Sequence, residues 1–404
     1  MRSIVYLNEC NFGSTGSIIR HLSQIANDKG FQTYFCYPKT NINKLSSQAN
    51  DFMFGNILVR NIETLINQHT GHLDSLYFFS THKLIKELES IKPDCIHIHN
   101  LHGNFINVKQ LFNYIKEKSI PVIWTLHDCW PFTGRCPHFL MNNCQKWMSN
   151  CSPCDYNFND YPKSRRDKSA ELLTYKRNSF CGVNKLVLVT PSQWLASLIP
   201  YSILKEYPTQ VINNGIDLEV FQPTKSTFKE RNNINRYMVL GVSNGWSNKK
   251  GLDVFIELAS KLGDDYKIVL VGTDAITETL LPNNIIPIRK TQNQKELAEL
   301  YSQADVFINP TREDTFPTVN IEALACGCPV ITFDTGGSPE ILNDLCGRVV
   351  PQNSVSDIVN NVYDICERKS IIRSNCTERS KSFNKNDRFR DYLNLYESVI
   401  SSNY

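Results

Sequence analysis

Short apolar runs alternate with longer amphipathic stretches along both halves of the chain. In the first half the strand-like runs are SIVYLN, FQTYFCY, DCIHIH, PVIWTL and KLVLVT, and the helical pattern covers residues 16–29, 81–91 and 108–118. In the second half the runs are YMVLGV, YKIVLVG, ADVFINP and CPVITF, with helices expected at 252–262, 294–301, 318–326 and 355–368. Apolar strands joined by helical crossovers predict parallel, doubly wound sheets. Because the pattern occurs twice, we expect an α/β protein with two Rossmann-like domains.

The length and one polar segment predict the domain boundaries. A chain of 404 residues is too long for a single ordinary hydrophobic core. Residues 221–237 are polar and lack apolar periodicity, which is typical of a linker. We therefore expect an N-terminal domain over 1–220, a C-terminal domain over 221–385, and an amphipathic helix over 386–404 that packs back toward the first domain. Since such sheets bind ligands at the carboxyl ends of their strands, the two domains are expected to face a deep cleft.

Composition narrows the class of protein and its compartment. A net charge of +3 is too small to indicate a nucleic-acid partner. The first residues enter a strand without a secretory leader, and no apolar run approaches the ~20 residues that span a bilayer. Most of the 14 cysteines stand singly in apolar runs, where a reduced cysteine acts as a small hydrophobe. These features predict a cytoplasmic protein.

Three loops after predicted strands carry candidate chemistry, and the first is NFGSTGSI. Its donors are backbone N–H groups at a helix start, which glycine lets a phosphate or sugar approach closely: Gly13, Ser14, Thr15 and Gly16. A plain strand–helix turn explains the same residues equally well. The spacing is not G-x-G-x-x-G, which disfavours dinucleotide binding.

The second loop, NGWSNKKG, places Lys249 and Lys250 directly before a glycine and a helix. A lysine at such a helix entry can neutralise a diphosphate leaving group. An ordinary solvated lysine pair is the alternative that the loop alone leaves open.

The third loop, TREDTFPTVNIEALACG, holds two carboxylates that require partners. Thr318 is the expected N-cap of the helix, and Glu322 lies about one turn inside, where it can accept both vicinal hydroxyls of a ribose. Asp314 can accept hydroxyls of a bound sugar. Glu322 on a wet helix face is the alternative, but small and apolar neighbours three and four residues away argue against it.

Histidines follow two further strands of the first half. His99 and His102 come after DCIHIH, and His127 with Asp128 comes after PVIWTL. Because the carboxyl ends of parallel strands meet at the same edge of the sheet, we expect these side chains to line the cleft. Zinc is an alternative use of these histidines, but they lack the i, i+4 spacing of a catalytic zinc site.

The assembled motifs resemble glycosyltransferase family 4 (group 1). PTREDTFPTVNIEALACGCPVITFDTGGSPEIL resembles the family's acid-x7-acid signature, and FGSTGSIIRHLS, HIHNLHGNFIN, WTLHDCWPFTGRCPHF, VTPSQWLA, NNGIDLEVFQP and KKGLDVFIELA follow in the family's order. The resemblance covers essentially the whole chain and is strongest to the bacterial branch of colanic acid, capsule and O-antigen synthesis. It implies the GT-B fold and a retaining transferase that needs no metal or other cofactor for catalysis.

The resemblance also implies roles for individual residues. Glu322 would hold the nucleotide ribose, Asp314 the donor hexose and Lys250 the diphosphate, while His127 would contact the donor sugar. We accordingly place His127, Asp314 and Lys250 in the catalytic set and His99, His102 and Asp128 on the acceptor side. The remaining donor-binding candidates are Gly13, Ser14, Thr15, Gly16, Asn244, Lys249, Arg289, Glu313, Phe316, Pro317, Thr318, Val319 and Glu322. Within this set, Glu313 is expected to be only a solvated neighbour of Asp314.

One position departs from the family pattern. Six residues before the diphosphate lysine the family commonly has arginine, and this chain has Asn244. Lys249, Arg289 or a residue outside the motif would then supply the second positive charge, or the leaving group is less stabilised.

The implied reaction moves a hexose or N-acetylhexosamine from a nucleotide sugar, with UDP the favoured nucleotide, to a glycan or lipid-linked acceptor by front-side substitution. In that reaction the departing phosphate oxygen accepts the acceptor's proton, and both carboxylates act as binding groups. A competing interpretation makes His127 with Asp128 a general base. The alternative functions are a nucleotide-sugar 2-epimerase of the same fold and a non-catalytic nucleotide-sugar-binding homologue.

Four cysteines gather in an irregular insertion at about 129–160. They are Cys136, Cys144, Cys151 and Cys154, and four thiolates suit a structural zinc ion. The spacing C-x7-C-x6-C-x2-C is not a familiar zinc pattern, so buried apolar cysteines remain the alternative.

A basic segment follows the insertion. It is expected to be helical and contains Lys163, Arg165, Arg166, Lys168, Lys176 and Arg177. Such a run is either a solvated face or a contact with the anionic cytoplasmic leaflet of the inner membrane.

Overall fold

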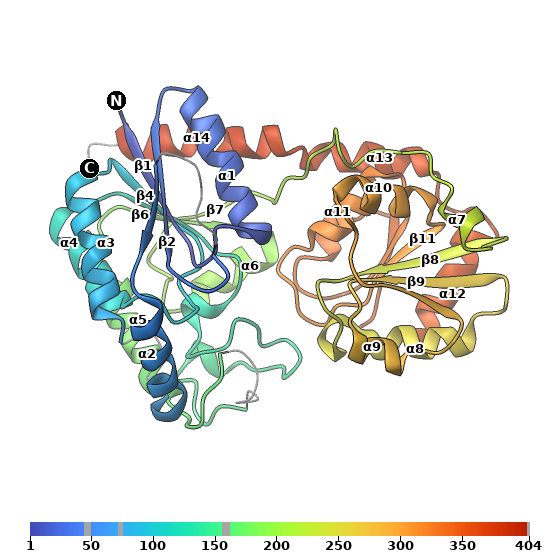
Figure 1. Ribbon diagram of the computed structural model, residues 1–404, viewed down its shortest axis with the longest axis horizontal. Coiled ribbons are helices and arrows are strands. Elements are labelled where there is room, and N and C mark those ends of the chain that lie inside the picture. Colours follow the sequence, from blue (N-terminus) through green and yellow to red (C-terminus); the bar gives the residue numbers. More distant parts are fainter. Residues whose placement is uncertain (44–49, 72–75, 156–161, 402–404) are drawn as a thin grey trace. The chain divides into compact units, whose positions relative to one another are not determined.

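The protein is described by a computed structural model that covers residues 1–43, 50–71, 76–155 and 162–401 (Figure 1). It divides into two compact units. Unit 1 comprises Met1–Ile212 together with Phe389–Tyr404, and unit 2 comprises Asn213–Arg388. The segment 221–237, expected to be a linker, lies within unit 2, where Phe221 and Ile234 are buried in the core.

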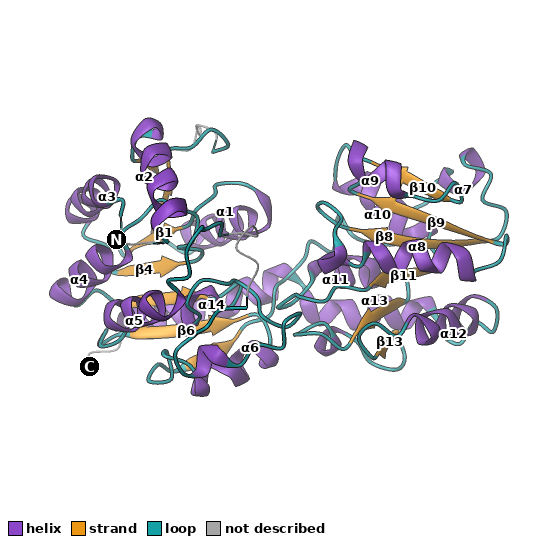
Figure 2. Ribbon diagram, turned by 90° about the horizontal axis from the view of Figure 1, so that it is seen from below, coloured by secondary structure: helices purple, strands orange, loops and turns teal. Residues whose placement is uncertain are grey.

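Unit 1 is built on a parallel sheet with the strand order β3-β2-β1-β4-β5-β6-β7. Figure 2 labels β1, β4 and β6 of this sheet. The strands are β1 (Ser3–Leu7), β2 (Gln32–Pro38), β3 (Asp51–Phe54), β4 (Cys95–Ile98), β5 (Val122–Thr125), β6 (Leu186–Thr190) and β7 (Thr209–Val211). Residues of β1 alternate between the two faces because the side-chain period of a strand is two. Ile4 and Tyr6 pack toward α1 and α14, whereas Val5 and Leu7 pack toward α3 and α4.

The helices of unit 1 cover both faces of that sheet. They are α1 (Gly13–Asp28), α2 (Ile57–Thr70), α3 (Phe78–Ile91), α4 (Val108–Lys118), α5 (Ser169–Phe180) and α6 (Gln193–Leu198). The C-terminal helix α14 (Lys385–Ser401) joins them, because its buried residues from Phe389 to Val399 belong to the core of unit 1. Among the described residues, no helix combines the length and the apolarity needed to span a membrane.

Unit 2 repeats the topology with the strand order β10-β9-β8-β11-β12-β13, again parallel throughout. Its strands are β8 (Tyr237–Val242), β9 (Tyr266–Val271), β10 (Ile285–Ile288), β11 (Val306–Asn309), β12 (Val330–Phe333) and β13 (Gly347–Val350). Its helices are α7 (Phe228–Arg231), α8 (Leu252–Lys261), α9 (Ala275–Leu280), α10 (Gln294–Gln303), α11 (Thr318–Ala325), α12 (Val355–Cys366) and α13 (Arg373–Ser380).

Two Rossmann-like parallel sheets confirm the predicted fold class. The strands that the apolar pattern missed are the four edge strands, β3, β7, β10 and β13. Edge strands have one neighbour and are often short and partly exposed, so they lack the continuous apolar run that marks a central strand. The central strands β4, β5, β11 and β12, by contrast, are buried at every position.

Candidate active site

The candidate residues of unit 2 lie on loops that leave two neighbouring strands. β8 and β11 pair in the middle of the sheet, and the chain winds outward from them in opposite directions. This is the topological switch point, where the loops at the carboxyl ends of the strands diverge and leave room for a ligand. Loop 243–251 follows β8 and loop 310–317 follows β11.

Lys250 and Asp314 form an ion pair across these two loops. Lys250 Nζ lies 3.0 Å from Asp314 Oδ2, with both side chains partly exposed. The Phe316 backbone N–H donates to Asp314 Oδ1 over 3.3 Å, which fixes the other carboxylate oxygen. The structure thus brings together the lysine and the first acid of the predicted donor site.

A second pair, Lys249 and Glu313, lies beside the first. Lys249 Nζ is 3.7 Å from Glu313 Oε2. Glu313 is 5% exposed, so the expectation of a solvated neighbour was wrong. A buried carboxylate needs a partner, and the adjacent Lys249 supplies opposite charge.

Arg312 and Gly251 hold the two loops in register. Arg312 donates to both carboxylate oxygens of Asp253 over 2.8 and 2.7 Å, and also to the Asn248 carbonyl. Gly251 adopts φ +77°, and a Cβ there would lie 2.6 Å from the carbonyl oxygen of Pro310. Arg312 was not among the sequence-predicted site residues, although its place in the acid-rich loop was a signal that could have indicated it.

Glu322 lies one turn inside α11 and is half-buried. Tyr301 Oη donates to Glu322 Oε2 over 3.3 Å. Burial raises the pKa of Glu322 to about 7, while hydrogen bonds from Tyr301 and Thr318 act in the opposite direction. Because burial leaves the carboxylate poorly solvated, hydrogen bonds from the hydroxyl groups of a ligand would favour its ionised form.

The start of α11 differs from the prediction in one respect. The N-cap is Pro317, not Thr318, and it offers no side-chain hydrogen bond. Phe316 is buried against Phe383 with ring centroids 5.8 Å apart, and its carbonyl accepts from Asn214 Nδ2 over 3.4 Å. The first turn, with Thr318 and Val319 half-buried, therefore presents backbone N–H groups without a side-chain cap, which favours an anion or a hydroxyl oxygen.

Two candidates do not join this cluster. Arg289 pairs with Glu278 through two hydrogen bonds of 2.9 and 2.8 Å at the surface. Asn244 is exposed on the loop after β8. Lys249 is therefore the predicted second cation that lies next to the Lys250–Asp314 pair.

In unit 1 the candidate residues lie at the equivalent switch point, between β1 and β4. Helix α1 begins after β1 without a side-chain cap, with Gly13 at φ +71° and Ser14 exposed. A Cβ on Gly16 would lie 2.6 Å from the Asn11 carbonyl carbon, so this glycine is required by the chain's own loop. Thr15 Oγ1 accepts a hydrogen bond from Asn8 Nδ2 over 3.2 Å.

His99 and His127 lie side by side at the ends of β4 and β5. Their rings stack, and His99 Nδ1 is 2.9 Å from His127 Nε2. Burial lowers the pKa of His127 to about 4 and that of His99 well below its usual range. Both imidazoles are therefore neutral at physiological pH, and one donates to the other.

His102 lies between two carboxylates. Its Nε2 is 2.9 Å from Asp128 Oδ2, and its Nδ1 is 3.5 Å from Glu9 Oε2. Burial acts to raise the pKa of Asp128, but the hydrogen bond and positive charge of His102 bring it below its usual value. Burial raises the pKa of Glu9. Glu9 was missed by the sequence analysis, although it follows β1 just as His99 follows β4.

Comparison with known proteins identifies the family. Residues 16–220 match the family described as Glycosyltransferase Family 4, and residues 224–383 match Glycosyl transferases group 1. The chain belongs to glycosyltransferase family 4. It is therefore a glycosyltransferase, an enzyme of the hexosyltransferase class, as the resemblance implied.

Two relatives place this glycosyltransferase in its family. WcaC of Escherichia coli K12, assigned to colanic acid biosynthesis as a glycosyl transferase, is 24% identical over 76% of this chain and 77% of its own length. The N,N'-diacetylbacillosaminyl-diphospho-undecaprenol alpha-1,3-N-acetylgalactosaminyltransferase of Campylobacter jejuni is 27% identical over 49% of this chain and 57% of its own length. The relatives support the bacterial polysaccharide branch.

Solved structures share the fold of this glycosyltransferase. Sucrose-phosphate synthase from Thermosynechococcus elongatus superposes with a TM-score of 0.74 at 15% identity, covering 99% of this chain and all of the other. Anabaena HepE in complex with UDP-glucose superposes with a TM-score of 0.67 at 15% identity, covering 98% of this chain and all of the other. These similarities confirm the two-domain GT-B architecture.

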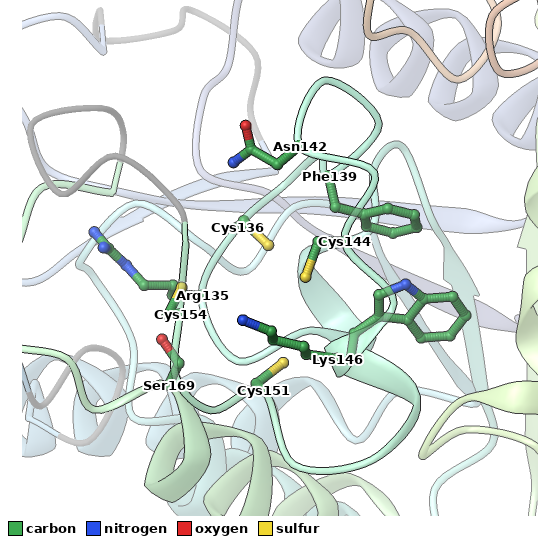
Figure 3. Close-up of a pocket in the computed structure, with 10 residues that line it drawn as sticks. Arg135, Cys136, Phe139, Asn142, Cys144, Lys146, Cys151, Cys154 and Ser169 are labelled. Atoms are coloured by element: carbon green, nitrogen blue, oxygen red, sulfur yellow. The ribbon is translucent and has the colours of Figure 1, made fainter.

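The cysteine insertion of this glycosyltransferase encloses a small cavity of about 20 Å³ (Figure 3). The four cysteines of the zinc prediction line it, as does Lys146, and all four are free thiols. Burial raises the pKa of Cys136 to about 12 and that of Cys151 to about 11, which keeps both protonated. Over the described ranges, no three His, Cys, Asp or Glu side chains are grouped closely enough to hold a metal ion. Residues 156–160 of the predicted insertion lie outside the described residues.

The basic segment after the insertion is not one helix. α5 begins only at Ser169, so Lys163, Arg165 and Arg166 lie on an extended stretch before it. Lys176 was wrongly included among the exposed cations. It is fully buried, with Nζ donating to the Trp130 carbonyl over 2.8 Å and lying 3.6 Å from the centroid of the Trp130 ring.

Proposed function

We propose that this glycosyltransferase moves a hexose or N-acetylhexosamine from a UDP-sugar, with retention of anomeric configuration, onto a lipid-linked saccharide or growing glycan in cell-surface polysaccharide synthesis. The Lys250–Asp314 pair carries the proposal. It places a cation and a carboxylate 3.0 Å apart at the switch point of unit 2, beside a helix start without a side-chain cap.

The donor would bind by replacing this ion pair with two separate contacts. The diphosphate would bind the Lys250 ammonium. The hydroxyls of the hexose would then donate hydrogen bonds to the Asp314 carboxylate, which the lysine no longer contacts. The Glu322 carboxylate would accept hydrogen bonds from the two ribose hydroxyls. The backbone N–H groups of Thr318 and Val319 would contact the sugar or its phosphate. Lys249, although paired with Glu313, adds positive potential beside the leaving group.

The chemical step requires that negative charge on the departing phosphate be stabilised. Lys250 and the start of α11 offer that stabilisation, because a preorganised cation and helix N-terminus favour developing anionic charge. The leaving phosphate oxygen then accepts the proton of the attacking acceptor hydroxyl on the same face of the sugar. Asp314 and Glu322 are binding groups in this scheme, since neither carboxylate need form a bond to the sugar.

Unit 1 would supply a contact to the donor sugar through His127 and the acceptor side through His99, His102 and Asp128. His127 is neutral and shares its Nε2 with His99, so it suits a hydrogen bond to a sugar hydroxyl better than the role of general base. The hydrogen-bonded pair of His102 and Asp128, with Nε2 and Oδ2 2.9 Å apart, offers polar groups to the hydroxyl groups of the acceptor.

The acceptor class rests on the relatives. The Campylobacter relative is named for transfer to a diphospho-undecaprenol, a lipid carrier, and WcaC is assigned to colanic acid. We therefore place the reaction at the cytoplasmic face of the inner membrane. UDP is the proposed nucleotide because HepE, which has the same fold, was crystallised with UDP-glucose.

A nucleotide-sugar screen tests the proposal. Purified protein is mixed with UDP- and GDP-sugars, thermal stabilisation selects the donor, and products with lipid-linked acceptors are identified by mass, with the anomeric linkage assigned by NMR. We expect stabilisation by a UDP-sugar and an α-linked product. Epimerised donor without transfer supports the epimerase instead, and binding without either reaction supports a non-catalytic homologue.

We also propose, as a structural feature, that the four-cysteine cavity takes one Zn²⁺ ion. Support comes from four free thiols around one cavity of about 20 Å³, which is enough space for roughly one water molecule. Binding would require the thiols to lose their protons and move together, because the present spacing is not that of a metal site. Elemental analysis after purification without chelator tests this: one zinc per chain that is lost in a Cys136→Ser, Cys151→Ser variant supports it, and its absence from the wild type contradicts it.

A further inference from the structure

Helix α2 is amphipathic, but it is oriented with its apolar face to solvent. Five side chains on one side of the helix are between 37% and 73% exposed: Leu58, Val59, Ile62, Leu65 and Ile66. At 100° per residue these positions fall within a single arc of about 120°. A surface helix normally buries this arc, so the exposed stripe indicates an interaction surface.

The opposite face of α2 is polar and attached to unit 1 by hydrogen bonds. Arg60 donates to the carbonyls of Gly103 and Asn104 over 2.8 and 2.9 Å. Asn67, fully buried, donates to Tyr77 Oη over 2.9 Å, and Glu63 accepts from the Tyr77 backbone N–H over 3.1 Å. These bonds fix the rotation of the helix, so the apolar stripe cannot turn inward without breaking them.

Further apolar and basic groups adjoin the same helix. α3 begins next to Tyr77, and its first residues Phe78 and Phe79 are 55% and 76% exposed. At the other end, the Arg165 backbone N–H donates to the Gln68 carbonyl over 2.7 Å, which places the basic stretch against the last turn of α2. Within the described part of the chain, the exposed Lys163, Arg165 and Arg166 make no ion pair.

We propose that α2, with Phe78 and Phe79, forms a lipid-docking surface that inserts its apolar stripe into an anionic membrane while Lys163, Arg165 and Arg166 contact the headgroups. α2 lies at the periphery of unit 1 in both views (Figure 1; Figure 2). The adjacent cations distinguish this surface from a purely apolar protein contact, because anionic lipid attracts basic side chains beside an interfacial helix. The location at a membrane rests on the proposed lipid-linked acceptor, but the surface itself does not.

Vesicle binding by the full-length protein tests the surface. The protein is sedimented with vesicles of phosphatidylcholine alone and with an equal mixture of phosphatidylcholine and phosphatidylglycerol. Wild type is expected to bind the mixed vesicles and to lose binding in high salt. The triple variant Leu58→Gln, Ile62→Gln, Leu65→Gln and the double variant Arg165→Gln, Arg166→Gln are each expected to bind at least about tenfold more weakly.

Matched controls separate docking from folding and from catalysis. Ile276→Gln with Leu280→Gln replaces exposed apolar residues of α9, and Lys225→Gln with Arg231→Gln removes exposed charge from unit 2. These controls are expected to bind vesicles like the wild type. All variants are expected to keep wild-type melting temperature and wild-type affinity for UDP, because none of the replaced residues belongs to the donor site.

Three results would overturn the proposal. The first is a wild-type protein that does not sediment with anionic vesicles. Another is an α2 variant that binds them as well as the wild type does. The third is a concentration-dependent dimer in solution, measured by light scattering, that the α2 triple variant abolishes, because the stripe would then join two copies of the chain. Transfer to a soluble acceptor, measured in parallel, reports on the proposed function separately, since it needs no vesicle.

Discussion

Lys250 Nζ and Asp314 Oδ2 lie 3.0 Å apart in the structure, so the groups proposed to bind the diphosphate and the adjoining hexose of the donor neutralise each other. Both side chains are partly exposed, at 39% and 24%. An ion pair of this exposure contributes only about 0.2–1 kcal/mol, so a ligand that offers better partners to both groups can separate it. The pair keeps a cation and a carboxylate at the site without a large barrier to donor entry.

This relationship predicts opposite effects of two substitutions on nucleotide binding. Asp314→Asn releases Lys250 from its partner, so UDP affinity is expected to stay the same or to increase by up to about fivefold, while transfer falls by at least about a hundredfold. Lys250→Met removes a charge-assisted contact and is expected to weaken UDP by about tenfold or more. Calorimetry with UDP and turnover assays measure both, and the double variant completes the cycle. Weaker UDP binding in Asp314→Asn would contradict the proposed exchange of partners.

Glu322 predicts a pH dependence of donor binding. Its pKa of about 7 means that the unliganded carboxyl is partly protonated at neutral pH, whereas ribose hydroxyls donate best to the carboxylate. Affinity for UDP-glucose, whose diphosphate has no group that titrates near neutrality, is therefore expected to rise as the pH increases from about 6 to about 8. In Glu322→Gln the affinity should be lower and independent of pH. A wild-type profile that is flat over this range would contradict the assignment of Glu322 to the ribose.

The same raised pKa has a consequence for stability. Because the folded-state pKa lies above the unfolded value, the contribution of Glu322 to stability is fully present below pH 4.5 and is lost as the pH rises through about 7. A bound donor would remove this loss by giving the carboxylate hydroxyl partners. We therefore expect stabilisation by UDP-glucose to be larger near pH 8 than near pH 6.

The sequence predicted the parts of the fold and of the site that depend on residues close together in the chain. Central strands such as VFIN of β11 are continuous apolar runs, and the loop after each was placed at a strand end by the apolar pattern alone. Asp314 was preferred to Glu313 on motif spacing, and in the structure Asp314 is the acid beside Lys250. The apolar pattern could not predict that Glu313 is buried or that Lys249, from a loop distant in the sequence, lies 3.7 Å from its carboxylate.

Helix α2 shows a different limit of sequence reasoning. Its apolar positions have helical spacing, yet the usual assumption is that such a face packs inward. Here the inward groups are Arg60, Glu63 and Asn67, and their partners lie at Tyr77 and at residues 103–104. Polar contacts at such separations leave no periodic signal in one sequence. The burial of Lys176 under Trp130 was missed for the same reason, since its partner lies 46 residues away.

Gly251 predicts a substitution that damages the donor loop. Alanine there would have to keep φ at +77° and place its Cβ 2.6 Å from the Pro310 carbonyl oxygen. Gly251→Ala is expected to lower the free energy of unfolding by more than the roughly 1–2 kcal/mol of the left-handed conformation alone, and to weaken UDP binding by displacing Lys250. Gly245→Ala is the matched control, with φ +93° and, apart from its chain neighbours, no atom of the described residues within 4 Å of its Cβ. Denaturant unfolding and calorimetry compare the two, and equal losses would exclude the steric contribution of Pro310.

The buried histidines of unit 1 predict a loss of stability in acid. The pKa of His127 is lowered from 6.5 to about 4 by burial, so protonation favours the unfolded chain, and stability that is present above pH 6.5 is lost as the pH falls toward 4. For His127 alone the loss between pH 7 and pH 5 is about 2 kcal/mol. His97 and His99, whose pKa values are also lowered by burial, add to this loss.

Urea unfolding at both pH values is expected to show a smaller loss of stability in acid for His127→Asn than for the wild type. His69→Asn, at an exposed position of α2, should leave the loss unchanged. If His127→Asn retained the full loss, His127 would have to be charged already in the folded protein, and its neutral hydrogen bond with His99 would be excluded.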